Sequence, residues 1–109
     1  MKLKDFVSNM FEVLNMGDFQ GIDISLNGLQ VGDYDNEVRK IAFAVDACQA
    51  SIDEAIKQKA NLLFVHHGLF WGKPLSITGS HYSRIKTMLD NNLALFACHL
   101  PLDAHLELG

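Results

Sequence analysis

Three short, nearly continuous apolar runs constrain the fold of this chain more than any other feature. They alternate with two stretches in which apolar residues recur at helical spacing, and they occupy residues 40–46 (KIAFAVD), 61–65 (NLLFV) and 93–98 (LALFAC). Such runs are typical of strands that are buried on both faces of a parallel sheet. The sequence therefore predicts an α/β fold with a β-α-β-α-β parallel-sheet core.

Helices are expected before the sheet and between its strands. Apolar residues at helical spacing over residues 3–14 predict an N-terminal helix that precedes the sheet. Ser51 and Glu54 form a Ser-x-x-Glu pattern, which predicts that the next helix starts at Ser51. A third helix is expected to carry Tyr82, Ile85, Met88 and Leu89 on one side and to end at the Asp-Asn-Asn sequence at residues 90–92.

The segment at residues 21–32 is consistent with two structures. Apolar and polar residues alternate on either side of Asn27-Gly28, and Asn-Gly supplies the positive φ angles of a tight β-hairpin. An irregular loop that packs its apolar residues inward would show a similar pattern. The sequence leaves the role of Asn27-Gly28 open.

Composition narrows the class of protein. A chain of 109 residues, 49% of them hydrophobic, suits a single globular domain. The net charge of −4 is unlike that of proteins that bind duplex nucleic acid or an anionic membrane, so neither partner is expected for this chain. Cys48 and Cys98 lie in apolar surroundings and are expected to be free, buried thiols. Because no apolar run is long enough for a membrane span, we expect a cytoplasmic protein.

Residues with metal-binding or catalytic side chains follow each predicted strand. Asp46 ends the first strand, His66 and His67 follow the second, and the segment from His99 to His105 (HLPLDAH) follows the third. Ligands of parallel α/β sheets bind beyond the carboxyl ends of the strands. The sequence therefore predicts a site where these three strand ends meet.

His66 and His67 are the strongest candidates for metal ligands, because neutral imidazole suits first-row divalent ions. Neighbouring residues on a strand point to opposite faces, so both rings converge only if the backbone turns, which Gly68 makes feasible. Alternatively, the two histidines address two metals in one shared site. Asp103, whose approach Pro101 stiffens, would bind a metal, bridge two metals or orient a histidine.

The remaining candidates carry weaker signals. His99 and His105 are open between a ligand role and local hydrogen bonding, whereas His81 is expected in the first turn of a solvent-facing helix. Phe70 and Trp71 either wall a pocket or cover a hydrophobic edge or subunit contact, and we favour the second interpretation. The sequence contains neither a GxGxxG motif nor a Walker-type loop, so it does not support nucleotide binding of those kinds.

Four ordered segments resemble the NIF3-like family, whose bacterial members are described as GTP cyclohydrolase 1 type 2 homologues. The segments are residues 23–32 (DISLNGLQVG), 44–47 (AVDA), 66–71 (HHGLFW) and 99–105 (HLPLDAH), and the similarity covers nearly the whole chain. The resemblance implies a site for two divalent metal ions, in which His66, His67 and Asp103 are ligands. Zinc, manganese, iron and nickel all suit such nitrogen and oxygen ligands.

The resemblance also implies that residues 1–109 form the N-terminal portion of a larger NIF3-like α/β domain. Family members add a histidine and a bridging glutamate from a His-x-x-x-Glu motif near their C-terminus, and this chain has no such motif. We therefore expect an incomplete metal shell, and no activity from this chain alone. No catalytic residue is assigned.

For the complete protein, the resemblance implies a di-metal hydrolase that opens the imidazole ring of a small GTP-like substrate. The alternative is a non-catalytic metal-binding ring protein with a regulatory or nucleic-acid-binding scaffold role. The resemblance further implies assembly as a toroidal homo-oligomer, typically a hexamer.

Overall fold

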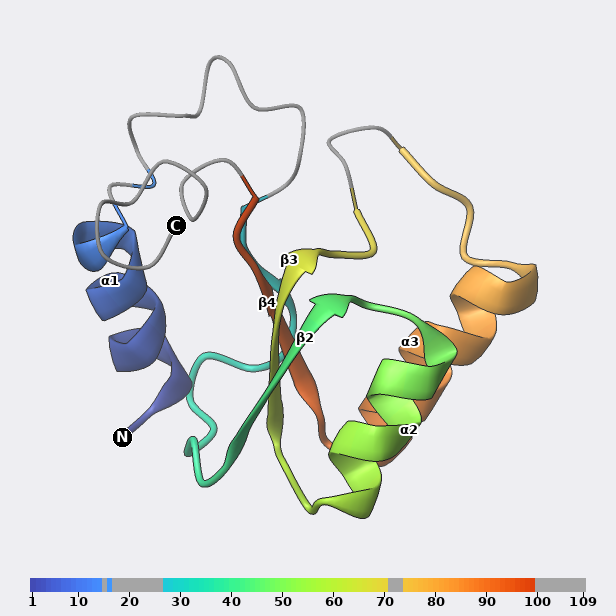
Figure 1. Ribbon diagram of the computed structural model, residues 1–109, viewed down its shortest axis with the longest axis horizontal. Coiled ribbons are helices and arrows are strands. Elements are labelled where there is room, and N and C mark those ends of the chain that lie inside the picture. Colours follow the sequence, from blue (N-terminus) through green and yellow to red (C-terminus); the bar gives the residue numbers. More distant parts are fainter. Residues whose placement is uncertain (15, 17–26, 71–73, 100–109) are drawn as a thin grey trace.

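A four-stranded sheet separates one helix from the other two in the computed structural model (Figure 1). The structure describes residues 1–14, 16, 27–70 and 74–99. Its elements, in chain order, are α1 (Leu3–Val13), β1 (Gly28–Val31), β2 (Ile41–Asp46), α2 (Gln49–Lys57), β3 (Leu62–His67), α3 (Gly79–Asp90) and β4 (Ala94–Ala97). Helix α1 lies on one side of the sheet, and α2 and α3 lie on the other.

The sheet confirms the predicted parallel core and adds one strand to it. Strands β2, β3 and β4 are parallel neighbours, and α2 and α3 connect them in the predicted order. The spatial order is β1-β4-β3-β2, with β1 antiparallel to β4. Leu29 and Val31 of the proposed hairpin therefore belong to a strand whose partner is β4. Residues 21–26, the other arm of that hairpin, lie outside the described residues.

Alternation along β3 divides the interior into two cores. Leu62 and Phe64 face α1 and pack in a cluster with Phe96 of β4. Leu63 and Val65 point the other way, into a cluster with residues of α2 and α3. Because successive side chains of a strand point to opposite faces, a strand covered by helices on both sides must be apolar throughout. This explains the continuous apolar runs of β3 and β4.

The prediction that β2 is buried on both faces is wrong. Phe43 is 73% exposed and Val45 is 65% exposed. Both lie on the α1 side of the sheet, where α1 covers β3 and β4. Strand β2 lies at the edge of the described sheet, and of its residues only Ile41 at its start is partly buried against the cluster that contains α1. Its opposite face, with Ala42 and Ala44, packs against the α2 side of the core. An apolar run identifies the strand but not its position in the sheet.

The start of α2 also differs from the prediction. The N-cap is Cys48, and Ser51 stands at the third helical position, where its hydroxyl accepts a hydrogen bond from the Cys48 backbone N–H at 3.0 Å. Ser51 thus has the role that the sequence pattern assigns to Glu54. The prediction for β3 was also short, because this strand continues through both His66 and His67.

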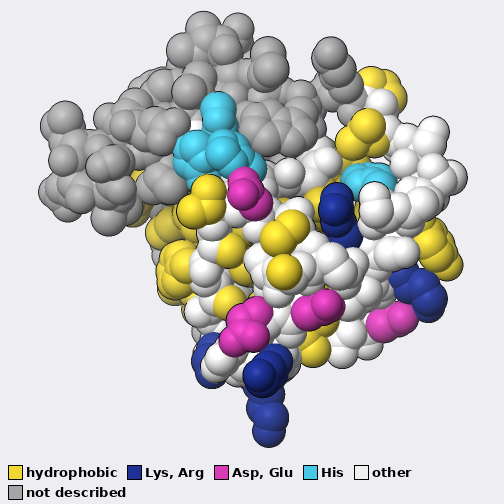
Figure 2. Space-filling view, turned by 45° about the vertical axis from the view of Figure 1, so that its right-hand side comes forward, with side chains coloured by type: hydrophobic (Ala, Val, Ile, Leu, Met, Phe, Trp, Pro, Cys, Tyr) yellow, Lys and Arg dark blue, Asp and Glu magenta, His cyan; other side chains and the backbone are white. Residues whose placement is uncertain are grey.

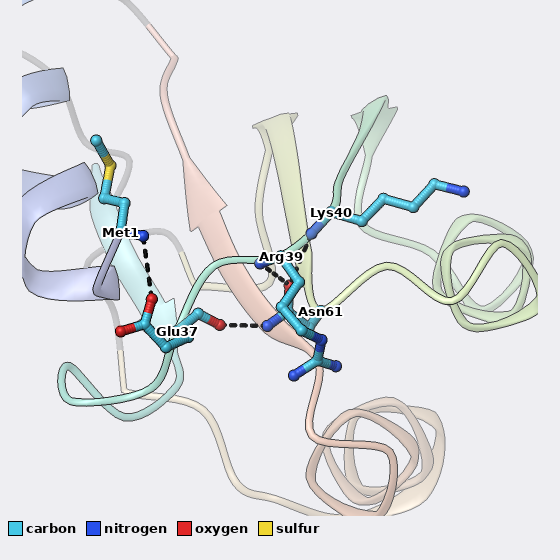
Figure 3. Close-up of polar contacts among 5 residues, drawn as sticks. All are labelled: Met1, Glu37, Arg39, Lys40 and Asn61. Atoms are coloured by element: carbon cyan, nitrogen blue, oxygen red, sulfur yellow. Dashed lines mark hydrogen bonds and ion pairs between the residues drawn. The ribbon is translucent and has the colours of Figure 1, made fainter.

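Asn61 fixes the chain where β2 and β3 begin (Figure 3). Its side chain is 7% exposed, and Oδ1 accepts hydrogen bonds from the backbone N–H groups of Arg39 at 2.9 Å and Lys40 at 3.2 Å. The Asn61 side-chain amide donates to the carbonyl of Glu37. The Glu37 carboxylate in turn pairs with the amino group of Met1 at 3.0 Å. One buried amide therefore satisfies three backbone groups that the sheet leaves unpaired.

None of the helices in the described ranges is long and apolar enough to cross a membrane.

Candidate metal centre

Three histidines meet at the carboxyl ends of β3 and β4. His66 and His67 are the last residues of β3, and His99 stands two residues beyond β4. One potential ligand atom from each histidine lies within 4.8 Å of the other two. Figure 2 shows histidine side chains gathered in one surface patch with an acidic side chain beside it, while a further histidine lies apart. The structure therefore brings together two of the three predicted ligands and adds His99.

Adjacent strand residues converge here because the strand ends. His66 borders an apolar groove that contains Phe64 and Val45, on the α1 side of the sheet. His67 contacts Asp46, which follows Ala42 and Ala44 on the α2 side. The His66 and His67 ring centroids nevertheless lie 4.4 Å apart, with an interplanar angle of 69°. The two rings therefore approach each other around the end of β3.

His99 completes the cluster through the sheet register. Val65 of β3 pairs with Ala97 of β4, and the backbone N–H of Cys98 donates to the Val65 carbonyl at 2.9 Å. Continuing this register by two residues places His99 opposite His67. The His99 ring centroid lies 4.7 Å from that of His66 and 5.3 Å from that of His67.

Strand β1 and the residue before it hold the backbone around the histidines. The Asn27 Oδ1 accepts a hydrogen bond of 2.7 Å from the backbone N–H of His99. The Gln30 Oε1 accepts hydrogen bonds from the N–H groups of Leu69 at 2.8 Å and Phe70 at 3.2 Å. The Gln30 Nε2 donates to the Phe70 carbonyl at 3.0 Å. These amides fix the segments that follow β3 and β4.

Gly68 lets the Gln30 amide approach this backbone. A Cβ atom at position 68 would lie 2.4 Å from the Gln30 Oε1 and 2.6 Å from its Nε2. Any other residue would therefore displace the amide from Leu69 and Phe70. The glycine after the two histidines therefore serves close packing.

The donor set fits a divalent metal ion. Zinc–imidazole bonds are about 2.0–2.1 Å long, so two nitrogens on one tetrahedral ion are about 3.3 Å apart. All three donor atoms already lie within 4.8 Å of one another, so modest side-chain rotation would bring them to that spacing. Three half-buried imidazoles are also a preferred donor set for first-row ions.

The other candidates are placed differently. Asp103, His105 and Trp71 lie outside the described residues. His81 is in the first turn of α3 as predicted, but it is half-buried, with its ring edge against Phe70 at a centroid distance of 5.0 Å. Phe70 packs against the core on the α2 side.

Both cysteines are free, as predicted. Cys98 is buried, whereas Cys48 is only half-buried at the start of α2. Hydrogen bonding with Ser51, first with its backbone and then with its side chain, holds the pKa of the Cys48 thiol below its ordinary value. Burial opposes this effect and does not cancel it.

Sequence reasoning left open or missed four residues that shape this centre. It left the roles of Asn27, Asp46 and His99 open, and it did not single out Gln30. Asp46 and His99 were signalled by their place at strand ends and by their position in segments that carry the family resemblance, neither of which assigned them a role. For Asn27 and Gln30 the contacts span 72 and 39 residues, and local patterns do not reveal such contacts.

Comparison with known proteins identifies the fold and its relatives. The family model Duf34/NIF3 (NGG1p interacting factor 3) matches residues 1–109. The chain belongs to the Duf34/NIF3 family. This confirms the resemblance that the four sequence segments indicated.

The relatives of this Duf34/NIF3 chain include curated proteins and a solved structure. It is 53% identical over 96 residues to a "GTP cyclohydrolase 1 type 2 homolog" of Treponema pallidum, covering 88% of this chain and 34% of that protein. A protein of the same name from Halobacterium salinarum is 47% identical over 109 residues, covering 100% and 42%. The crystal structure of TTHA1606 from Thermus thermophilus superposes with a TM-score of 0.93 at 45% identity, covering 100% and 44%.

The chain therefore spans between a third and a half of the length of these relatives. Its sheet and helices correspond to that part of the Duf34/NIF3 fold.

Proposed function

We propose that this part of the protein supplies the ligands of a divalent-metal centre. The observation that supports this most directly is the cluster of His66, His67 and His99, with donor atoms within 4.8 Å of one another. Asp103 follows His99 by four residues in the sequence, and we propose it as the oxygen ligand of the same centre. Two ions would share this mixed nitrogen and oxygen set, together with ligands from elsewhere in the complete protein.

The reaction that we propose for the complete protein is hydrolysis. Bound divalent ions supply Lewis acidity, which activates water and polarises a substrate. The chain's own contribution is to hold three imidazoles at one edge of a rigid sheet, where the donors need little reorganisation. The names of the relatives make a GTP-like purine nucleotide the first substrate to test, by hydrolytic opening of its imidazole ring.

Metal binding is tested in the protein expressed from its complete gene, because only that protein carries the remaining ligands. The purified metal-free protein is titrated with zinc in competition with a coloured chelator. We expect His67→Ala to weaken zinc binding at least tenfold. His81→Ala is the matched control, because it removes a half-buried histidine that lies outside the cluster. Equal zinc affinity of the wild type and His67→Ala would refute the proposed centre.

Hydrolysis is tested separately in the protein expressed from its complete gene. Zinc- or manganese-loaded protein is incubated with GTP, and loss of the purine absorbance is followed. Activity that is abolished by chelation and absent in His67→Ala would support the hydrolase. Metal binding without turnover would favour the non-catalytic alternative.

We also propose that the complete protein is a cytoplasmic homo-oligomer, with a hexameric ring as the form to test. Light scattering coupled to gel filtration measures its mass directly. A monomer at micromolar concentration would refute this assembly.

A further inference from the structure

We propose that Asp46 is a positioning residue for the metal centre, an inference that rests on the proposed function. Its carboxylate holds the His67 ring with the proton on Nδ1, so that Nε2 presents its lone pair to a divalent cation. The Asp46 Oδ1 lies 2.6 Å from the His67 Nδ1. Asp46 acts through His67: among the described residues, the group that could hold a metal comprises the three histidines and does not include Asp46.

The sheet register delivers Asp46 to this position. Asp46 pairs with His67 in the parallel ladder between β2 and β3, as Ala44 pairs with Val65 two residues earlier. Directly paired residues of neighbouring strands project from the same face of a sheet. The carboxylate therefore reaches His67 from the α2 side, without any contribution from a loop.

The backbone on both sides of the Asp46 carboxylate is fixed. The Ser51 hydroxyl donates to the Asp46 carbonyl at 2.7 Å, which ties the strand end to α2. The N–H of Ala47 donates to the His67 carbonyl at 2.8 Å, which ties the next residue to β3. The backbone that carries the carboxylate is therefore held in place, although the Asp46 side chain is 63% exposed.

An ionised carboxylate accepts hydrogen bonds and cannot donate them, so it decides the tautomer of a neutral imidazole that it contacts. The hydrogen bond to Asp46 requires a proton on Nδ1, and the lone pair of the neutral ring is then on Nε2. Partner carboxylates of this kind fix the ring orientation of metal-binding histidines and raise their basicity. If the contact between Asp46 and His67 were only a surface ion pair, its removal would leave the His67 tautomer and the metal affinity unchanged.

Asp46→Ala tests the assignment with two independent measurements. Long-range proton–nitrogen spectra of the metal-free protein, recorded where His67 is neutral, report which ring nitrogen carries the proton. Zinc affinity is measured by chelator competition, and we expect a loss of about 10–100-fold. Asp90→Ala is the matched control, because it removes another exposed carboxylate from an ion pair, with Lys86 at 2.9 Å.

The wild type is expected to show His67 with the proton on Nδ1, and Asp46→Ala is expected to shift it toward Nε2. Asp46→Asn should lose affinity as well, since a neutral amide is a weaker acceptor. An unchanged tautomer in Asp46→Ala, or zinc affinity within twofold of the wild type, would overturn the role of Asp46 alone. A wild type that binds no zinc would overturn the proposed function, and the imidazole spectrum would still decide whether Asp46 sets the tautomer.

Discussion

Gln30→Ala should destabilise the loop that follows the two histidines and weaken metal binding at a distance. Gln30 makes three hydrogen bonds with the backbone of Leu69 and Phe70, at 2.8, 3.2 and 3.0 Å. Each net hydrogen bond contributes about 1 kcal/mol, so complete loss would cost about 3 kcal/mol. Because Gln30 is half-buried, water would replace some of the lost hydrogen bonds. We therefore expect the free energy of unfolding to fall by about 1.5–2.5 kcal/mol.

Two assays separate the local effect from the global one. Urea denaturation gives the change in unfolding free energy, and amide hydrogen exchange reports the protection of Leu69 and Phe70 individually. We expect these two amides to lose protection more than the amides of β3 do. Zinc affinity should fall with them, since the loop begins directly after His67.

Two further variants sharpen this experiment. Gln30→Glu keeps an acceptor for both N–H groups but loses the donor to the Phe70 carbonyl, so its effect should be intermediate. Gln49→Ala removes a half-buried glutamine whose hydrogen bond to Asp53 is exposed, and it should leave stability, exchange and zinc affinity unchanged. Unaltered exchange at Leu69 and Phe70 in Gln30→Ala would refute the role of Gln30 in holding the loop.

Three other predictions follow from burial and hydrogen bonding. Asn61→Ala leaves three backbone groups without their partner and should lower the unfolding free energy by about 2–4 kcal/mol in urea denaturation. Phe43→Ser should change stability by no more than about 0.5 kcal/mol in the same assay, since its ring is 73% exposed, and a larger loss would show that the ring is covered. Iodoacetamide should alkylate Cys48 before the buried Cys98, as read by peptide mass spectrometry. Because the Cys48 thiol pKa is lowered, its thiolate persists to lower pH than that of a free thiol, and Ser51→Ala should move the reaction profile to higher pH.

The parallel core was predictable because burial on two faces leaves a strong local signal. Residues 62–65 and Ala94–Ala97 are apolar without interruption, and α3, which buries Met88 in the core, separates them. The same signal misled for β2, where Phe43 and Val45 are exposed. The edge position of a strand depends on which other strands pair with it, and the residues of the strand itself do not encode this information.

The histidine pair was predictable for a different reason. His66 and His67 follow an apolar strand directly, and the position of ligands at the carboxyl ends of parallel strands is a property of the fold. The sequence places His99 at the same edge of the sheet. It does not predict that His99 contacts the pair, because this contact depends on the register between β3 and β4. The hydrogen bonds from Asn27 and Gln30 to the segments after β4 and β3 could not be predicted. They depend on the pairing of β1 with β4, which is distant in the sequence.

Register is the physical link between the sheet and the site. The pairs Asp46 with His67 and Val65 with Ala97 belong to one continuous parallel ladder across β2, β3 and β4. Read two residues beyond Ala97, that ladder aligns Asp46, His67 and His99 in one row. A slip of one residue in either pairing would turn apolar side chains of β3 away from their core and also remove a histidine from the row. The burial of Leu63 and Val65 therefore stabilises the fold and this row of residues together.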